Sequence, residues 1–482
     1  MLASLSATEI IWSLSWLAAL LTVPSVLLQR AGRPTAALSW LLALFALPGL
    51  AVVAWWLFGR IHLRRKKRQR RRASQQSTAS LLAARQGLSV QSKSLAPVPA
   101  PVSRAVTLPP ALNDAVFLPS SGNLVSLLQD TPAVHRAWHR LVDDAQHHLH
   151  LHLLFYLWRD DHTGRDMRNR LVAKARSGVE VRVLYDAVGS WRLPRHFFEP
   201  LTVAGGKAVA FMPFKLFSST PTLNFRNHRK LLIADGMRAY TGGVNVGDEY
   251  LDWQDIGVCI EGPGVNQLQE VFIDDWFFAA TEELTAPDYF CDPATAVTGG
   301  GGAVCEIVAS GPDQVFNTTR EMLFLAITQC RKRLWIATPY FVPDGALMLA
   351  LRTAVYRGVD VRLFVPHDSD APLVQGASRV FYAELLEAGV KVFEFAGMLH
   401  AKAVLLDEED VSIGSANLDT RSFRLNFELS TFVTDPLLSR DLAGFFEQLR
   451  ARSRSVALSE LERAAPLSRL KDAVAHLLAP LL

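Results

Sequence analysis

Two long uncharged stretches dominate the hydropathy pattern at the start of the chain. Residues 10–28 hold no charged side chain, and neither do residues 36–58. A helix needs about 20 apolar residues to cross a hydrocarbon core of about 30 Å, so both stretches are long enough. Residues 1–9 lack the Lys and Arg with which a signal peptide begins. We therefore expect a transmembrane helical hairpin over residues 1–60, with Pro48 tolerated inside its second helix.

A basic segment follows the second stretch. Residues 60–72 carry nine Lys or Arg, whereas the loop between the two stretches carries two. The positive-inside rule then places this segment, and everything after it, in the cytoplasm. Basic residues next to a membrane span attract anionic lipid headgroups by about 1 kcal/mol each. Residues 73–112 are rich in Ser, Gln, Ala and Pro, as in a tether. We expect residues 61–115 to form a basic segment and flexible linker.

The pattern beyond the linker alternates helices with buried strands. Continuous apolar runs predict strands at 149–157 and 178–185, and again at 333–339 and 358–365. A helix-like stretch precedes the second strand of each pair, and a further short strand follows it. Helices that alternate with parallel strands predict an α/β sheet covered on both faces.

The same order of elements occurs twice. The two copies meet at a run of four glycines, residues 299–302, which suits a linker. We expect two pseudo-symmetric α/β halves, residues 116–298 and 303–482. Such duplicated halves commonly pack about a pseudo-two-fold axis, which would bring equivalent residues together.

A repeated motif carries the candidate chemistry. Its members are separated by 172 positions in every case: His228 and His400, Lys230 and Lys402, Asp235 and Asp407, Asn245 and Asn417. A Gly-Gly or Gly-Ser pair precedes each Asn by two positions. A single motif of such common residues would be weak evidence, but two in one register are very hard to obtain by chance.

Strand geometry indicates what each motif residue can do. Residues two apart on a strand share a face, so each His lies beside the Lys that follows it. Asp235 and Asp407 come five positions after the Lys, which is the wrong parity for that face. We expect these two carboxylates to brace the site at a strand end. The glycines suit a close backbone approach, and each Asn supplies an amide donor.

Composition and charge exclude several classes of protein. Hydrophobic residues make up 50% and charged residues 20% of the chain, which excludes a disordered protein. The net charge of +4 is concentrated in residues 1–72, which hold eleven bases and one acid. The rest has 39 bases against 45 acids, so no nucleic acid partner is expected. Four cysteines without CxxC spacing indicate free thiols.

One alternative site is a row of alternating histidines. His148, His150 and His152 would lie on one face of a strand, where they could bind a metal. No carboxylate or cysteine accompanies them at a useful spacing, and the matching strand of the second half has no histidine. We favour partly buried strand histidines and expect no metal site.

The doubled motif resembles that of the phospholipase D superfamily, and within it bacterial cardiolipin synthases. The pattern is His-x-Lys-x4-Asp followed by Gly-Gly/Ser-x-Asn. Further features of the resemblance are the segments 224–230, 253–255, 338–341, 421–423 with Asn426 and Glu428, and 479–482. It covers nearly the whole chain apart from residues 73–112.

The resemblance implies a phosphatidyltransferase of the bacterial inner membrane, a multi-pass protein with its catalytic part in the cytoplasm. Such an enzyme takes the phosphatidyl group of one phosphatidylglycerol and passes it to a second, giving cardiolipin and glycerol. Its partners would be phosphatidylglycerol and other anionic membrane lipids. Neutral imidazole can attack phosphorus, and a second imidazole can protonate the leaving oxygen. The lysines and asparagines supply donors for the phosphoryl oxygens, so we expect no metal or other cofactor.

The resemblance also implies roles for individual residues. By the family pattern, His228 is the nucleophile and His400 the acid and base, although the symmetry of the sequence does not choose between them. Asp255 and Glu428 would hold the imidazoles; the alternative is that they are surface acids. Two other functions stay open: a phospholipase D that uses water or another alcohol, and a non-catalytic lipid-binding scaffold. The oligomeric state is not indicated.

Overall fold

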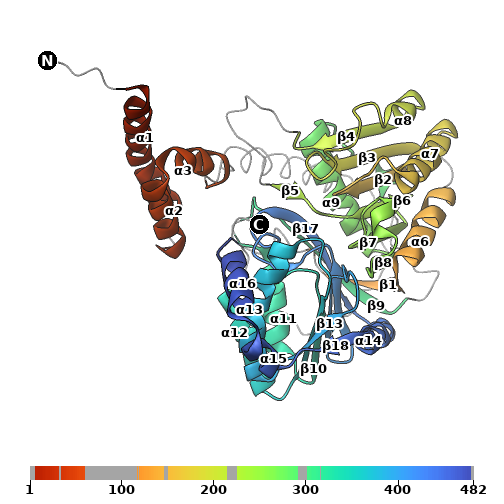
Figure 1. Cartoon of the computed structure of the whole chain (residues 1–482). Coiled ribbons are helices and arrows are strands. Elements are labelled where there is room, and N and C mark those ends of the chain that lie inside the picture. The colour runs from red at the N-terminus through yellow and green to blue at the C-terminus, as the bar shows by residue number, and fades with distance from the viewer. Residues whose placement is uncertain are drawn as a thin grey trace. The chain divides into compact units, whose positions relative to one another are not determined.

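The computed structural model describes residues 6–31, 34–59, 117, 119–145, 150–213, 225–290, 301–314 and 316–478. The chain divides into an N-terminal helical unit, within residues 1–69, and an α/β unit that holds the other described residues. Figure 1 shows the helices of the first unit and the strands and helices of the second. The expected linker, residues 61–115, and the first two glycines of the run, residues 299–300, lie outside the described residues.

The N-terminal unit begins with α1 (Ala7–Gln29), which is long and apolar enough to cross a membrane. Ser6 caps this helix, because its Oγ accepts the Glu9 backbone N–H at 3.4 Å; in return, the Ser6 backbone N–H donates to the Glu9 carboxylate at 2.8 Å. Residues Thr8–Gln29 have a mean hydropathy of 1.9. Pro24 is accommodated within the helix. The first of the two predicted membrane-spanning helices is therefore present, by length and composition.

The second predicted membrane-spanning helix is wrong as a single element. It is split into α2 (Pro34–Ala46), α3 (Pro48–Ala54) and the π-helix η1 (Trp55–Gly59). The break lies at Leu47, whose backbone is not helical. Pro48 causes it, because proline lacks an N–H donor and disfavours a helical residue before it. The pieces pack on α1, and Trp55 Nε1 donates to Ser25 Oγ at 3.2 Å.

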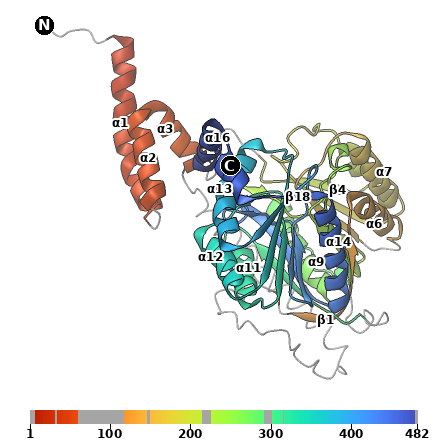
Figure 2. The same cartoon turned by 60° about the horizontal axis from the view of Figure 1, so that its bottom comes forward.

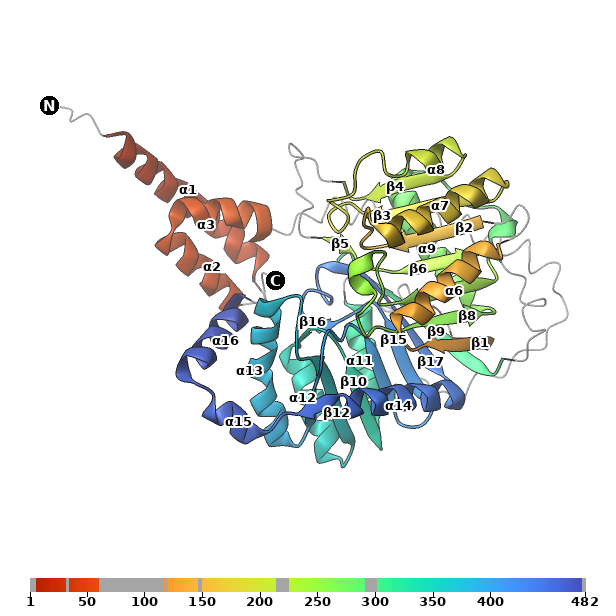
Figure 3. The same ribbon diagram turned by 45° about the vertical axis from the view of Figure 1, so that its right-hand side comes forward.

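A mixed sheet runs through both halves of the α/β unit (Figures 1 and 3). The first half contributes β1 (Ser120–Leu128), β8 (Gly257–Glu261), β7 (Arg238–Gly242), β6 (Leu231–Ala234), β2 (His150–Phe155), β3 (Glu180–Asp186) and β4 (Lys207–Phe211), in spatial order. The second half contributes β9 (Ala303–Ser310), β17 (Asn426–Thr434), β15 (Asp410–Gly414), β14 (Ala403–Leu406), β10 (Arg333–Ala337), β12 (Asp360–Pro366), β13 (Lys391–Phe395) and β18 (Ser453–Ser455).

The two halves join edge to edge through β1 and β9. These strands pair antiparallel, with Ser120 opposite Cys305 and Asn123 opposite Ala303. Outward from this joint, both halves have the same order of strands apart from the extra β18 at one edge. In each half the two strands predicted from apolar runs and the short strand predicted after them are parallel neighbours: β2, β3 and β4, and β10, β12 and β13. The predicted α/β fold of two pseudo-symmetric halves is confirmed.

Helices cover both faces of the sheet. The first half has α6 (Thr131–Asp143), α7 (His162–Arg176), α8 (Glu199–Val203) and α9 (Gly264–Ala280). The second half has α11 (Thr318–Gln329), α12 (Gly345–Tyr356), α13 (Pro372–Ala388), α14 (Pro436–Ala451), α15 (Leu458–Arg463) and α16 (Pro466–Leu478). Figure 2 shows α14 on one face of the second half's sheet and α11 to α13 on the other. An Asp or Asn caps five of these helices: Asp130, Asp161, Asn317, Asp344 and Asp435.

Successive residues of the central strands are buried on opposite faces. Val181 and Val183 of β3 belong to the core beneath α6 to α8, and the intervening Arg182 packs 6.0 Å from the ring of Trp276 in α9. In the second half, Trp335 of β10 lies 6.0 Å from Phe446 of α14. Burial on both faces explains why these strands have continuous apolar runs instead of alternation.

Candidate active site

The two His-x-Lys segments lie directly before a strand and not within one. His228 and Lys230 lie between β5 (Arg226–Asn227) and β6, and His400 and Lys402 come just before β14. The prediction that each pair shares a face within a strand is therefore wrong in position. The two residues of the first segment are nevertheless in contact, since Lys230 Nζ donates to the backbone carbonyl of His228 at 2.7 Å.

Each His-x-Lys segment pairs with the backbone of the other half. In the first, β5 runs parallel to the start of β17, and His228 N donates to the carbonyl of Phe427 at 2.9 Å. In the second, Leu399 bridges Gln254, and His400 N donates to the Gln254 carbonyl at 2.8 Å. The halves thus exchange short extended segments at their joint.

This exchange crosses the histidine–carboxylate pairs. His228 Nδ1 lies 3.1 Å from Oε2 of Glu428, which belongs to the second half. His400 Nδ1 lies 2.6 Å from Oδ2 of Asp255, which belongs to the first half. All four side chains are buried. A carboxylate at Nδ1 fixes the tautomer of each ring and leaves Nε2 for the reaction. The expectation that these acids hold the imidazoles agrees with this geometry, but the sequence did not predict the crossing.

The two carboxylates are seated differently. Glu428 Oε2 accepts a hydrogen bond from Ser415 Oγ at 2.5 Å, and Oε1 accepts one from Asn426 at 3.0 Å. Gly243 occupies the position in the first half that corresponds to Ser415, and a Cβ there would come within 2.3 Å of Asp255 Oδ1. The Gly-Gly and Gly-Ser pairs of the motif therefore make room for, or bind, the carboxylate that orients the opposite histidine.

One cavity of about 500 Å³ brings the motif residues together. His228, His400, Asn245 and Asn417 all line it. Oδ1 of each asparagine is buried and has no hydrogen-bond partner among the described residues. Because an unpaired buried acceptor is costly, each Oδ1 is poised for a ligand group that donates a hydrogen bond. The ring of Tyr156 lies 4.8 Å from that of His228 and completes this wall.

Two buried lysines lie beside the histidines that line the cavity. Both are buried, and Lys402 Nζ lies 2.8 Å from His400 Nδ1 and also donates to the His400 carbonyl. Burial, reinforced by repulsion from Lys402, holds the pKa of Lys230 well below its usual value. Burial lowers the pKa of Lys402 to about 8. An anion bound between them would stabilise both charged forms, so the pair is suited to a phosphate.

Burial also keeps the histidines neutral. It lowers the pKa of His228 to about 4, although Glu428 acts in the opposite direction. Burial and the adjacent Lys402 lower the pKa of His400, and Asp255 opposes them. A neutral imidazole whose Nδ1 proton points to a carboxylate has its Nε2 lone pair available for nucleophilic attack or for taking up a proton.

The motif aspartates occupy tight turns away from the cavity lining. Asp235 follows β6 and Asp407 follows β14, with left-handed φ angles of 61° and 53°. The Asp407 carboxylate accepts backbone N–H groups from Arg331 at 3.0 Å and Lys332 at 2.6 Å. Asp407 thus ties a hairpin turn to the start of β10. These contacts are consistent with the expectation that Asp407 braces the site through the backbone at the end of the strand that follows His400.

A buried ion pair beside the site was missed from the sequence. Arg229 Nη1 lies 2.7 Å from Asp275 of α9, while its Nε donates to the Glu428 carbonyl at 3.1 Å. Asn227 also donates to Asp275, at 2.9 Å. The cluster links the first half to the strand that bears Glu428. The repeat held a signal for it, because the position that matches Arg229 in the second half is Ala401.

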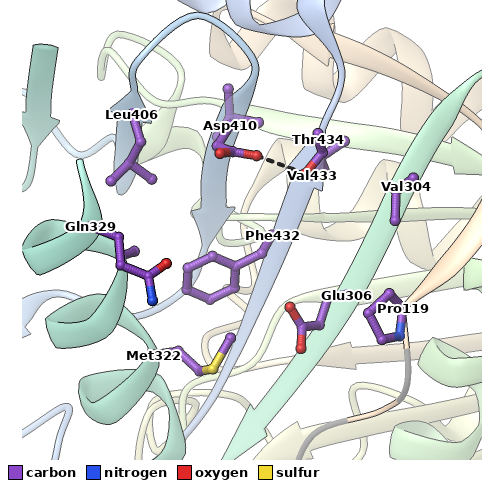
Figure 4. A pocket seen from close by; sticks show the side chains of 12 residues that line it. Pro119, Val304, Glu306, Met322, Gln329, Leu406, Asp410, Phe432, Val433 and Thr434 are labelled. Carbon is purple, nitrogen blue, oxygen red and sulfur yellow. Dashed lines mark hydrogen bonds between the residues drawn. The ribbon is translucent and has the colours of Figure 1, made fainter. Parts of the chain in front are cut away.

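A smaller cavity of about 100 Å³ lies elsewhere, among β9, β15, β17 and α11 (Figure 4). Glu306 points into it beside Met322 and Phe432, and burial raises the pKa of Glu306 to about 7. None of the repeated motif residues lines this cavity.

The alternative metal site stays untested. His148 lies outside the described residues, and His150 and His152 are on β2 with their side chains outside them as well.

Comparison with known proteins identifies the family. The sequence model of the "Cardiolipin synthase, PLD-like domain" matches the chain twice, at residues 139–276 and 323–450. The chain is 35% identical to the cardiolipin synthase of Geobacillus kaustophilus, over 93% of this chain and 89% of that protein. The chain belongs to the cardiolipin synthase family. The family resemblance noted in the sequence is thereby confirmed.

Further comparisons place the family motifs on a known fold. The major cardiolipin synthase ClsA of Bacillus subtilis is 34% identical over 99% of this chain and 100% of its own length. The crystal structure of phosphatidylserine synthase from Haemophilus influenzae covers 74% of this chain and 95% of its own, with a TM-score of 0.58 and 15% identity. That likeness shows that this structure and the phosphatidylserine synthase share a fold.

Proposed function

We propose that the protein joins two phosphatidylglycerol molecules to give cardiolipin and glycerol. The observation that carries this proposal is the single cavity of about 500 Å³ lined by both motif histidines. A phosphodiester needs a nucleophile on one side and an acid on the other, and two imidazoles with carboxylates at Nδ1 supply both. The names of the relatives add the substrate class, since they are cardiolipin synthases.

The reaction has two steps, and in each step one bond to phosphorus forms while another breaks. In the first, Nε2 of one histidine bonds to the phosphorus of the donor, and the bond from phosphorus to the headgroup oxygen breaks. The second histidine gives its proton to that oxygen, and glycerol leaves. In the second step, a hydroxyl of the acceptor loses its proton to this second histidine and attacks phosphorus. The phosphorus–nitrogen bond breaks, and cardiolipin forms.

The structure favours His228 as the nucleophile and His400 as the acid and base. The pKa of His228 falls to about 4 because the ring is buried, so it is neutral and nucleophilic at physiological pH. His400 has the shorter carboxylate contact, 2.6 Å to Asp255, which best stabilises an imidazolium. Binding of the anionic donor adds negative charge beside His400, which favours its protonated form.

Lysines and asparagines from both halves would hold the reacting phosphate. Lys230 and Lys402 supply positive charge, and Asn245 and Asn417 supply amide donors, one of each from each half. Preorganised donors of this kind stabilise the charge on the phosphoryl oxygens in the transition state. Asp235 and Asp407 would act only through the backbone they brace.

The N-terminal unit would anchor the protein in the bacterial inner membrane. Support comes from α1, whose length and hydropathy fit one span, and from the nine bases of residues 60–72. The catalytic part would lie on the cytoplasmic side, and the broken segment from α2 to η1 would make the second pass in place of a single helix.

Lipid analysis of the purified protein tests the proposal. The full chain is incubated with phosphatidylglycerol alone in mixed micelles, and the products are measured by mass spectrometry. Cardiolipin and glycerol in equal amounts are expected. Phosphatidic acid as the main product would instead indicate a phospholipase D that uses water. If no phospholipid is turned over, the result would indicate a non-catalytic lipid-binding scaffold.

A further inference from the structure

Two arginines on one side of the cavity have no role in the chemistry described so far. Arg226 lies on β5, two residues before His228, and Arg421 lies in the loop after Asn417. Both line the cavity. Neither arginine has a function in the two-step reaction, although Arg226 lies in the same segment as His228.

The fold brings these arginines together from different halves. Arg226 lies opposite Asn426 in the parallel pairing of β5 with β17. The carbonyl of Arg421 accepts a hydrogen bond from the same Asn426 N–H at 3.2 Å. Consistent with this proximity, burial and then the charge of Arg226 lower the pKa of Arg421. Like charges are held close only where the structure fixes them or an anion joins them.

The pair is also close to the nucleophile. Arg226 opposes the rise in the pKa of the Tyr156 hydroxyl, so the two side chains are near each other, and the Tyr156 ring lies 4.8 Å from that of His228. A neighbouring acid, Asp186, accepts backbone N–H groups from Gly189 at 2.8 Å and from Asn227 at 2.7 Å. One aromatic side chain therefore separates the arginine pair from the reacting ring.

The arginines break the two-fold symmetry of the site. With the motif spacing of 172, Arg226 corresponds to Met398 and Arg421 corresponds to Glu249. Glu249 is neutralised by Arg159, 2.8 Å away. In contrast, the lysines, asparagines and histidines that surround the reacting phosphate are the same in both halves. The residues that occur in both halves are expected to surround the reacting phosphate. The two arginines occur in one copy only, so they are expected to bind a second anion beside it.

The proposed reaction requires such a second anion. The acceptor phosphatidylglycerol carries its own phosphodiester, separated from the attacking hydroxyl by the three carbons of glycerol. We propose that Arg226 and Arg421 bind the phosphodiester of the acceptor lipid beside the reacting phosphate. Guanidinium groups bind phosphate through paired hydrogen bonds, and here they would hold the acceptor hydroxyl in line for attack. This inference rests on the proposed function and makes the pair the selector of a lipid acceptor over water.

A neutral acceptor provides the test. Labelled glycerol can replace the lipid acceptor, and its incorporation into phosphatidylglycerol uses the same donor step without a second phosphate. Cardiolipin formation and glycerol exchange are measured on the full chain in the same micelles. In Arg226→Gln and Arg421→Gln, the ratio of cardiolipin formation to exchange should fall about 10- to 100-fold, as for a lost hydrogen bond to a charged group. Arg424→Gln is the matched control, because Arg424 is exposed and does not line the cavity; its ratio should stay at that of the wild type.

The outcomes separate this inference from the proposed function. Equal losses of both reactions in the Gln variants would assign the arginines to the donor phosphate or to folding, and an unchanged ratio would remove them from binding. Either result overturns the inference. If a Gln variant does not fold, Arg421→Lys decides, since it keeps the charge but loses the paired hydrogen bonds; an intermediate ratio is expected and a wild-type ratio refutes the inference. A wild-type protein that performs neither reaction contradicts the proposed function itself.

Discussion

Replacing Asp255 with Asn should disable the histidine of the opposite half and spare that of its own. Asp255 contacts His400 at 2.6 Å, so the substitution removes a charge-assisted hydrogen bond. Such a bond contributes about 1.5–3 kcal/mol, or roughly 10- to 150-fold in rate, to a step that needs a protonated His400. The loss lies within the 10²–10⁴-fold that general acid catalysis provides. Glycerol release from phosphatidylglycerol should therefore slow by roughly 10- to 150-fold.

The leaving group distinguishes this effect from a general loss. A phosphatidyl-nitrophenol hardly needs protonation, so Asp255→Asn should release nitrophenol at nearly the wild-type rate and then accumulate a phosphohistidine adduct. His400→Ala should behave in the same way, whereas His228→Ala should form no adduct. Glu428→Gln is the matched control from the other pair, and it should slow release from both substrates because it acts on His228.

Intact-protein mass spectrometry and stopped-flow absorbance measure these two quantities. The reasoning is refuted if Asp255→Asn prevents adduct formation, as His228→Ala should, or if Glu428→Gln slows only the natural substrate. An adduct in His228→Ala but not in His400→Ala would reverse the roles of the two histidines.

Four further predictions concern charge, stability, metal and membrane. Because a lysine is charged below its pKa, kcat/KM should fall above about pH 8 as Lys402 deprotonates. Lys402→Arg should remove this fall, and an identical pH–rate profile in the variant would contradict the prediction. Arg229→Met leaves Asp275 buried without its cation and should lower the free energy of unfolding by about 3–5 kcal/mol, measured by denaturant titration, while Lys332→Met in an exposed pair should cost less than about 1 kcal/mol. Activity should survive EDTA, and a loss that Mg²⁺ or Zn²⁺ restores would contradict the metal-free mechanism. Deleting residues 1–60 should release the protein from membranes in high salt, as followed by sedimentation; continued binding would show that another segment is the main anchor.

The repeated apolar runs made most of the fold predictable from the sequence. Strands such as β3 and β12 are buried on both faces, so their pattern is unbroken and their positions are found to within two residues. The second membrane segment was mispredicted because hydropathy averages over positions, whereas one proline at 48 interrupts the helix through its backbone. An average over composition does not detect the loss of one backbone N–H donor at a single position.

The site was predictable in its members but not in its connections. The spacing of 172 identified the histidines, lysines and asparagines, since a duplicated motif is visible without coordinates. The partner of His228 depends on β5 pairing with β17 across the joint, which is a contact between residues 200 positions apart. The partner of His400 depends on the bridge between Leu399 and Gln254. Arg229 escaped notice because it occurs once, and its value lies in the carboxylate and carbonyls that tertiary packing places around it.

The crossed carboxylates have a consequence for how this architecture can arise. A single half would hold a histidine whose orienting acid is missing and an acid with no histidine to orient, so it would be inert alone. Two identical halves would complete each other only as a symmetric pair, in which both acids had to be the same residue. Fusion into one chain removed that constraint and let each acid adapt to a different neighbour. The two acids now differ: Asp255 lies beside Gly243, and Glu428 lies beside Ser415. If the halves of this chain were expressed as separate proteins, they would have to associate before either histidine had its carboxylate.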